Sequence, residues 1–280
     1  MCGVGKGIRS MKATVLIDNI RAEDLTPEWG LCIYIEYRDK KILLDTGASG
    51  RFLSNAEKLE IPIEQVDYGV LSHAHYDHAD GMEAFFQKNK KADFFIREGS
   101  KENCYAKKFI FSRYIGIKKG TLEAYQERIR FVSGDYELMP GVFLIPQKTE
   151  GLARVGRKNG MYVKKGGFMR PDDFSHEQSL VLDTDRGLVI FNSCSHGGAD
   201  TIIRETGSAF PGKHIYALAG GFHLFNRPEE EVRELAERIL ETGIEKIYTG
   251  HCTGKEAYGI LKEMLGERAV QLRTGLVIEI

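Results

Sequence analysis

Three histidines and one aspartate stand within six residues in the segment Leu-Ser-His-Ala-His-Tyr-Asp-His. The apolar run before this segment is typical of a buried strand. Residues two apart at a strand end point the same way, so His73, His75 and Asp77 can converge, and His78 reaches a neighbouring point. These side chains suit zinc first, with iron or manganese as alternatives. Four such ligands exceed what one open catalytic ion needs from one loop. They predict two adjacent divalent metal ions rather than a surface histidine cluster.

This segment resembles the His-x-His-x-Asp-His signature of the metallo-β-lactamase superfamily. The resemblance implies that His73 and His75 belong to one metal site, and that Asp77 and His78 belong to a second. An upstream Asp-Thr-Gly, at the end of an expected strand, matches the same family. In that family its aspartate, here Asp45, orients a metal-binding histidine from behind.

The superfamily takes its remaining ligands from later strand ends. His251 follows an expected strand in Thr-Gly-His and matches the family's final histidine, at the second site. His196 follows another expected strand in Asn-Ser-Cys-Ser-His, where the superfamily usually carries a bridging aspartate that this chain lacks. The resemblance therefore implies that His196 completes the first site, with water or hydroxide as the only bridge.

Four motifs resemble one branch of this superfamily, the dihydropterin–aminobenzene ribofuranosyl phosphate synthases of methanopterin biosynthesis. Leu-Ser-His-x-His-Tyr-Asp-His, Cys-Ser-His, Gly-Gly-Phe-His-Leu and His-Cys-Thr-Gly occur here in that order. The branch implies a transferase that releases diphosphate from a pterin-methyl diphosphate. A metal-dependent hydrolase of a phosphodiester or thioester is the alternative. A non-catalytic metal or redox sensor is least favoured, because the chain has no C-x-x-C motif.

Several residues beside these motifs have two interpretations. His176 precedes a strand where other superfamily members carry their third histidine; we expect an exposed loop residue and keep a metal ligand as the alternative. Its neighbour Glu177 is then a supporting or substrate-facing carboxylate. His223 is expected to contact substrate or transfer a proton, since two preceding glycines permit close approach to a ligand; a structural histidine is the alternative. Cys194 and Cys252 are expected only to pack the walls of the site.

Residues 151–170 include six Lys or Arg and five glycines but no acidic residue. We expect a mobile basic loop beside the metal site, in which Lys164 and Lys165 bind a phosphorylated small molecule. A solvated surface loop is the alternative. The Gly-Gly-Ala-Asp that follows His196 is expected to begin a helix, whose N-terminus also favours an anion.

Composition places few restrictions on the chain beyond a globular class. Its 280 residues are 42% hydrophobic and 28% charged, and the net charge of −1 argues against a general nucleic-acid binder. No apolar run approaches the roughly 20 residues that span a bilayer, so we also expect no membrane partner. Five scattered cysteines argue against a disulfide framework and favour the cytoplasm. The sequence is compatible with a homo-oligomer.

Strand-like and helix-like runs alternate along the chain. With the family resemblance, this predicts an α/β (α+β) fold: a four-layer αββα sandwich of two mixed sheets with outer helices. Residues 1–10 are expected to be a disordered leader or tag remnant. Residues 11–280 should form one domain, with an aromatic and basic insertion at about 91–170 over the site. A late helix is expected between Asn226, as its cap, and Gly243.

Overall fold

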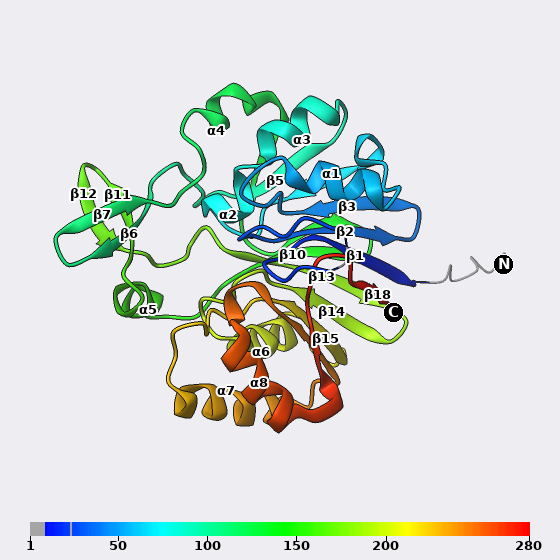
Figure 1. The fold of residues 1–280 in the computed structure, drawn as a ribbon, viewed down its shortest axis with the longest axis vertical. Coiled ribbons are helices and arrows are strands. Elements are labelled where there is room, and N and C mark those ends of the chain that lie inside the picture. The colour runs from blue at the N-terminus through cyan, green and yellow to red at the C-terminus, as the bar shows by residue number, and fades with distance from the viewer. Residues whose placement is uncertain (1–8, 23) are drawn as a thin grey trace.

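The computed structural model describes residues 9–22 and 24–280, which form four main layers (Figure 1). Two seven-stranded sheets lie face to face, and helices cover the outer face of each. The mixed α/β sandwich expected from the sequence is confirmed. The expected leader, residues 1–10, lies outside the described residues except for its last two positions.

The first sheet has the strand order β18-β1-β2-β3-β4-β5-β8. Its strands are β1 (Met11–Ile17), β2 (Cys32–Tyr37), β3 (Lys40–Leu44), β4 (Tyr68–Val70), β5 (Asp93–Arg97), β8 (Ile129–Val132) and β18 (Val277–Glu279). β18 and β1 to β3 pair antiparallel, whereas β3, β4, β5 and β8 pair parallel. Leu44 pairs with Val70, so β3 and β4 end side by side. The residues that follow these two strands therefore emerge together.

The second sheet has the strand order β17-β16-β15-β14-β13-β10-β9. Its strands are β9 (Tyr136–Met139), β10 (Val142–Pro146), β13 (Gln178–Thr184), β14 (Gly187–Phe191), β15 (Ile215–Gly220), β16 (Lys246–Thr249) and β17 (Ala269–Gln271). β14 to β17 pair parallel, and β9, β10, β13 and β14 pair antiparallel. The start of β13 therefore lies at the same edge as the end of β14.

The main core fills the space between the two sheets. It joins residues such as Ile33 and Val70 of the first sheet to Leu180 and Phe191 of the second, all fully buried. Burying one such side chain contributes about 1.5–3 kcal/mol. Two further apolar clusters attach the outer helices to the sheets. This packing fixes the two sheets relative to each other.

Helices α1 (Arg51–Lys58), α2 (Tyr76–Ala79), α3 (Met82–Lys88) and α4 (Thr121–Ala124) lie on the side of the first sheet; α6 (Ala199–Ala209), α7 (Glu229–Glu241) and α8 (Lys255–Leu265) cover the second (Figure 1). Short 3-10 turns are η1 (Ile63–Gln65), η2 (Gln126–Arg128), η3 (His251–Thr253) and η4 (Gly266–Arg268). The prediction that Asn226 caps this helix is wrong, because α7 begins at Glu229 and its N-cap residue is Pro228. None of the described helices is long and apolar enough to cross a bilayer.

A third, four-stranded sheet projects from one end of the sandwich (Figure 1). It contains β6 (Cys104–Lys108), β7 (Phe111–Tyr114), β11 (Met161–Lys165) and β12 (Phe168–Pro171), with α5 (Leu152–Lys158) beside it. Residues 91–170 are therefore divided among all three sheets. The loop expected at residues 151–170 is instead a helix followed by a hairpin, because β11 pairs with both β12 and β6.

Asn55 ties α1 both to β1 and to the segment that follows it. Its buried side-chain amide donates to the carbonyls of Leu16 (2.8 Å) and Thr26 (2.9 Å) and accepts from the Thr26 N–H (2.9 Å). We expect Asn55→Ala to lower the free energy of unfolding by about 2–4 kcal/mol, since these buried groups lose their partner. Urea denaturation followed by circular dichroism measures the change. The exposed neighbour Ser54→Ala is the control, expected within about 0.5 kcal/mol; equal effects would contradict the prediction.

Candidate metal centre

The candidate site lies where strands of both large sheets end. The carboxyl ends of parallel strands meet at one edge of a sheet, the usual place for a site in such folds. β3 and β4 of the first sheet lead into Asp45 and the histidine-rich segment. β14, β15 and β16 of the second sheet lead into the segments of His196, His223 and His251. The structure therefore gathers the residues that the sequence placed at separate strand ends.

One group of histidines presents buried ring nitrogens without hydrogen bonds. The Nε2 atoms of His73, His75 and His196 are buried and lack a hydrogen-bond partner among the described residues. The ring centroids of His73 and His75 are 4.7 Å apart, and that of His196 lies 5.0 Å from His73 and 5.2 Å from His75. Buried polar nitrogens rarely lack a partner, so these three converging nitrogens fit a shared cation.

The opposite ring nitrogens of two of these histidines are held by oxygen atoms. His73 Nδ1 lies 2.9 Å from the Ser72 hydroxyl, which itself donates to Asp45 Oδ2 at 2.7 Å. His196 Nδ1 donates to the buried Glu177 carboxylate. This hydrogen-bond network assigns the proton to Nδ1 in both rings. Each Nε2 therefore keeps a lone pair, the form that binds a metal ion.

A second group forms around His78 and His251. His78 Nδ1 donates to Asp45 Oδ2 at 2.7 Å, and His251 Nδ1 donates to Asn19 Oδ1 at 3.1 Å. Their Nε2 atoms are 3.2 Å apart. Asp77 Oδ2 lies 3.7 Å from the first and 3.5 Å from the second. Lone pairs and a carboxylate that face one another this closely require a proton or a cation between them.

Asp45 supports both groups. Its fully buried carboxylate accepts hydrogen bonds from the Ser72 N–H (2.7 Å), the Ser72 hydroxyl (2.7 Å), the Ser193 hydroxyl (2.6 Å) and His78 Nδ1 (2.7 Å). Its backbone is left-handed, with φ of 59°. Such strain persists only where surrounding contacts enforce it. Through its contact with Nδ1, Asp45 fixes the orientation of the His78 ring.

Burial and mutual repulsion keep most of these imidazoles neutral. Burial, and then the neighbouring histidines, hold the pKa of His73, His75 and His251 well below its usual range. Burial opposes protonation of His78 too, but Asp77 and Asp45 raise its pKa to about 9. A side chain must be deprotonated to bind a metal ion, so neutral imidazoles beside carboxylates are suited to hold a divalent cation.

His176 does not occupy the exposed loop expected for it. Its side chain is 2% exposed, its Nδ1 accepts the Ala74 N–H (3.2 Å), and its Nε2 lies 3.0 Å from Asp172 Oδ2. The chain turns inward here to begin β13, which explains the burial. His176 also forms a buried cluster with His75, Cys104 and Asp172, whose ligand atoms all lie within 4.8 Å of one another.

His223 and Glu177 lie beside the first group. The His223 ring centroid is 5.0 Å from that of His196, and its buried Nδ1 has no partner in the described part of the chain. Glu177 contacts His196 and Gln147, so it supports a histidine. The preceding glycines permit close packing of strand ends instead of access to a ligand. A Cβ on Gly220 would lie 1.9 Å from the Asn192 carbonyl oxygen.

A cavity of about 440 Å³ opens next to His196 and His223. Its walls also include Lys158, Arg227 and Arg238, and Gly198, which caps α6. Lys164 and Lys165 lie on β11 and are exposed, and neither is among its lining residues. Lys158 belongs to the basic segment 151–170, in which the sequence analysis favoured Lys164 and Lys165 instead, and Arg227 lay in no motif; only folding places α5 and the start of α7 beside the histidines.

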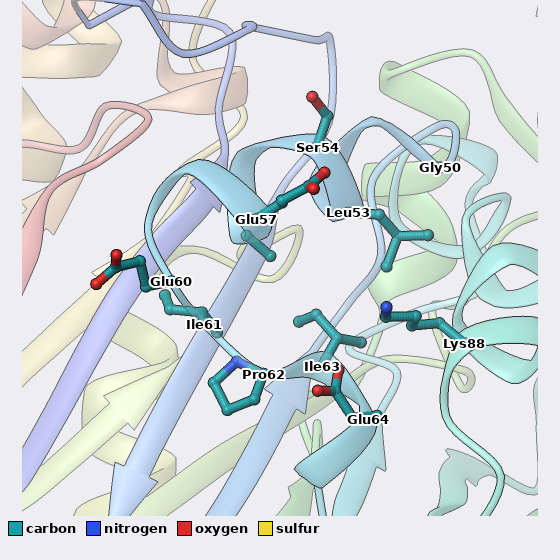
Figure 2. Close-up of a pocket in the computed structure, with 11 residues that line it drawn as sticks. Gly50, Leu53, Ser54, Glu57, Glu60, Ile61, Pro62, Ile63, Glu64 and Lys88 are labelled. Atoms are coloured by element: carbon teal, nitrogen blue, oxygen red, sulfur yellow. The ribbon is translucent and has the colours of Figure 1, made fainter.

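A larger hollow of about 620 Å³ lies away from these histidines, among α1, η1 and α3. Figure 2 shows Glu57, Glu60 and Glu64 around it with apolar side chains between them. Its lining includes no histidine or cysteine, so the smaller cavity is the one that adjoins the clustered ligands.

Comparison with known proteins agrees with this geometry. The sequence pattern of the "Metallo-beta-lactamase superfamily" matches residues 25–251. The chain belongs to the metallo-beta-lactamase superfamily. This superfamily fold implies binding of divalent metal, and the buried clusters of histidine, cysteine and aspartate supply suitable groups. The fold class expected from the sequence is the one found.

Two curated relatives of this chain come from Methanocaldococcus jannaschii. One, named 7,8-dihydropterin-6-methyl-4-(beta-D-ribofuranosyl)-aminobenzene-5'-phosphate synthase, is 29% identical over 291 residues, covering 94% of this chain and 97% of that protein. The other is uncharacterized and is 26% identical, covering 89% and 93%. The resemblance to the synthase branch is thus confirmed over nearly the whole chain.

Two solved structures illustrate the range of similarity. Tm1679, described as a metal-dependent hydrolase of the beta-lactamase superfamily, is 28% identical with a TM-score of 0.82, and the match covers 96% of this chain and 99% of that one. A diphosphatase of the PhnP family is 13% identical with a TM-score of 0.54, covering 97% of each chain. The second likeness concerns the fold alone.

The contact between Glu177 and His196 generates a test of metal binding. We expect Glu177→Gln to weaken divalent-metal binding about 10–100-fold, because a neutral amide oxygen accepts the His196 Nδ1–H more weakly than a carboxylate does and no longer makes the ring more basic. Competition with a chromogenic chelator measures the affinity. Glu57→Gln, on the exposed face of α1, is the matched control and should leave the affinity unchanged. An unchanged metal affinity in Glu177→Gln would contradict the role of Glu177 in supporting His196.

Proposed function

We propose that the clustered side chains hold two divalent cations, with zinc favoured and iron or manganese as alternatives. The first would be held by His73, His75 and His196, and the second by Asp77, His78 and His251. The support is the set of buried Nε2 atoms that have lone pairs but no partner in the described residues. His176 is the alternative ligand for the first cation, through its cluster with His75.

We further propose that the protein is a synthase-type transferase. It would join an aminobenzene ribofuranosyl phosphate to a pterin-methyl diphosphate and release diphosphate. The observation that carries this proposal is the nearly full-length similarity to the synthase of M. jannaschii, together with the Cys-Ser-His and Gly-Gly-Phe-His motifs at the site. Bound divalent cations would supply positive charge for a departing diphosphate.

The chain's own residues would bind the phosphorylated substrate in the cavity beside His196. Three basic side chains and two glutamates line it, and the N-terminus of α6 opens into it at Gly198. A helix N-terminus and guanidinium groups are both suited to phosphate oxygens. His223 would accept the proton that the arylamine loses on bond formation, and its buried Nδ1, which has no partner among the described residues, supports this role.

A hydrolase acting on a phosphodiester or thioester is the second candidate. The observation that favours it is the similarity to Tm1679, described as a metal-dependent hydrolase, over nearly the whole of both chains. Bound divalent cations would lower the pKa of water toward neutrality and so would supply the hydroxide nucleophile that such a reaction needs. A non-catalytic metal or redox sensor is the least favoured candidate.

The two reactions differ in their need for the arylamine. We expect the metal-loaded protein to release diphosphate from a pterin-methyl diphosphate only when the aminobenzene ribofuranosyl phosphate is present. Coupled detection of diphosphate measures the rate, and His75→Ala is the inactive control because it loses a first-site ligand. Release without the arylamine would favour the hydrolase, and no release under either condition would contradict the synthase.

The cavity also predicts which basic side chains bind the substrate phosphate. Arg227 lines it and bonds Asn159 and Glu231 through its two terminal nitrogens. We expect Arg227→Met to raise KM for the phosphorylated substrate about 10-fold or more, through loss of a charge-assisted hydrogen bond. Lys165→Met is the matched control on the exposed hairpin. Steady-state kinetics measures KM for both variants. A larger rise in KM for Lys165→Met than for Arg227→Met would favour phosphate binding by Lys164 and Lys165 instead.

A further inference from the structure

Cys194 follows the end of β14, where the superfamily usually carries a bridging aspartate. The sequence suggested that this cysteine only packs a wall. The structure instead places its 3% exposed side chain between the two groups of histidines. Its surroundings therefore differ from those of an ordinary buried thiol, which packs among apolar side chains.

The cysteine sulfur belongs to both groups of candidate ligand atoms. Cys194 Sγ lies within 4.8 Å of ring nitrogens of His73 and His196, which are themselves within that distance of each other. It also lies within 4.8 Å of ring nitrogens of His78 and His251. The distance from Cys194 Sγ to His78 Nε2 is 3.3 Å. No carboxylate in the described residues belongs to both of these groups.

The nitrogens around the sulfur supply a second, independent observation. His73 and His196 are at least nine-tenths buried, and their Nε2 atoms lack partners in the described chain. A thiol has a single weak proton and cannot satisfy several lone pairs at once. A thiolate with a cation on each side satisfies all of them, and zinc and cobalt both accept sulfur ligands.

We propose that Cys194 is a thiolate ligand shared by the two cation positions, in place of the bridging carboxylate. This inference rests on the proposed metal centre and adds a ligand to it. The thiol loses its proton to solvent when the cations bind, and one sulfur–metal bond forms with each cation. No oxidation or reduction takes part.

Cys252 is the natural control. Its Sγ lies 3.4 Å from Cys194 Sγ and accepts the His223 N–H at 3.3 Å. Although it follows His251 directly in the sequence, it belongs to none of the ligand groups found among the described residues. The two cysteines are equally buried and adjacent, yet the geometry assigns metal binding to only one of them.

Cobalt(II) tests the assignment without any measurement of activity. A thiolate ligand gives an intense near-ultraviolet charge-transfer band, which nitrogen and oxygen ligands do not give. We expect this band in the wild-type protein loaded with cobalt and in Cys252→Ala, and we expect its loss in Cys194→Ala. Cobalt affinity should also fall about 10-fold or more in Cys194→Ala, while Cys252→Ala stays near wild type.

A wild-type band that survives in Cys194→Ala would overturn the proposal, as would a band lost only in Cys252→Ala. X-ray absorption on the wild-type zinc protein provides a second measurement that does not depend on the folding of a variant. A sulfur neighbour at about 2.3 Å supports the proposal, and only nitrogen and oxygen neighbours overturn it. Binding of cobalt without sulfur would refute Cys194 alone, whereas no binding would refute the metal centre itself.

Discussion

The buried carboxylate of Asp45 is the constraint on which the site depends. It accepts hydrogen bonds from Ser72, which follows β4, from Ser193, which follows β14, and from His78, which lies in α2. An ionised carboxylate is costly to bury unless donors surround it, so the strand ends of both sheets must meet around it. Asp45 orients the His78 ring by a direct hydrogen bond and the His73 ring through the Ser72 hydroxyl. It therefore fixes which nitrogen of each ring faces inward.

The sandwich converts this local constraint into a rigid site. Packing between the sheets sets the separation of β4 from β14, and hence of the first histidines from those of the second sheet. Four non-glycine residues here have left-handed backbones: Asp45, Ser195, His223 and His251. These backbone conformations change the direction of the side chains that follow a strand. Each costs about 1–3 kcal/mol of strain, which the packed core offsets.

The proposed metal centre and the proposed substrate cavity meet at His196. Glu177 holds one side of its ring, the opposite nitrogen faces the cluster, and the ring lines the basic cavity. A phosphorylated substrate in that cavity would lie next to the cations. The proposed thiolate of Cys194 would lower the net charge of the centre, and thereby moderate its attraction for the anionic group.

The sequence, with the family resemblance that its motifs carry, predicted the fold class and one local cluster of candidate ligands, because strand and turn geometry brings His73, His75, Asp77 and His78 together. Their spacing suffices without knowledge of distant contacts. Only the tertiary structure buried His176, placed Cys194 between the histidine groups and brought Lys158 and Arg227 to the cavity. These residues come from separate elements, and their proximity follows from sheet packing and helix docking, which no local spacing encodes.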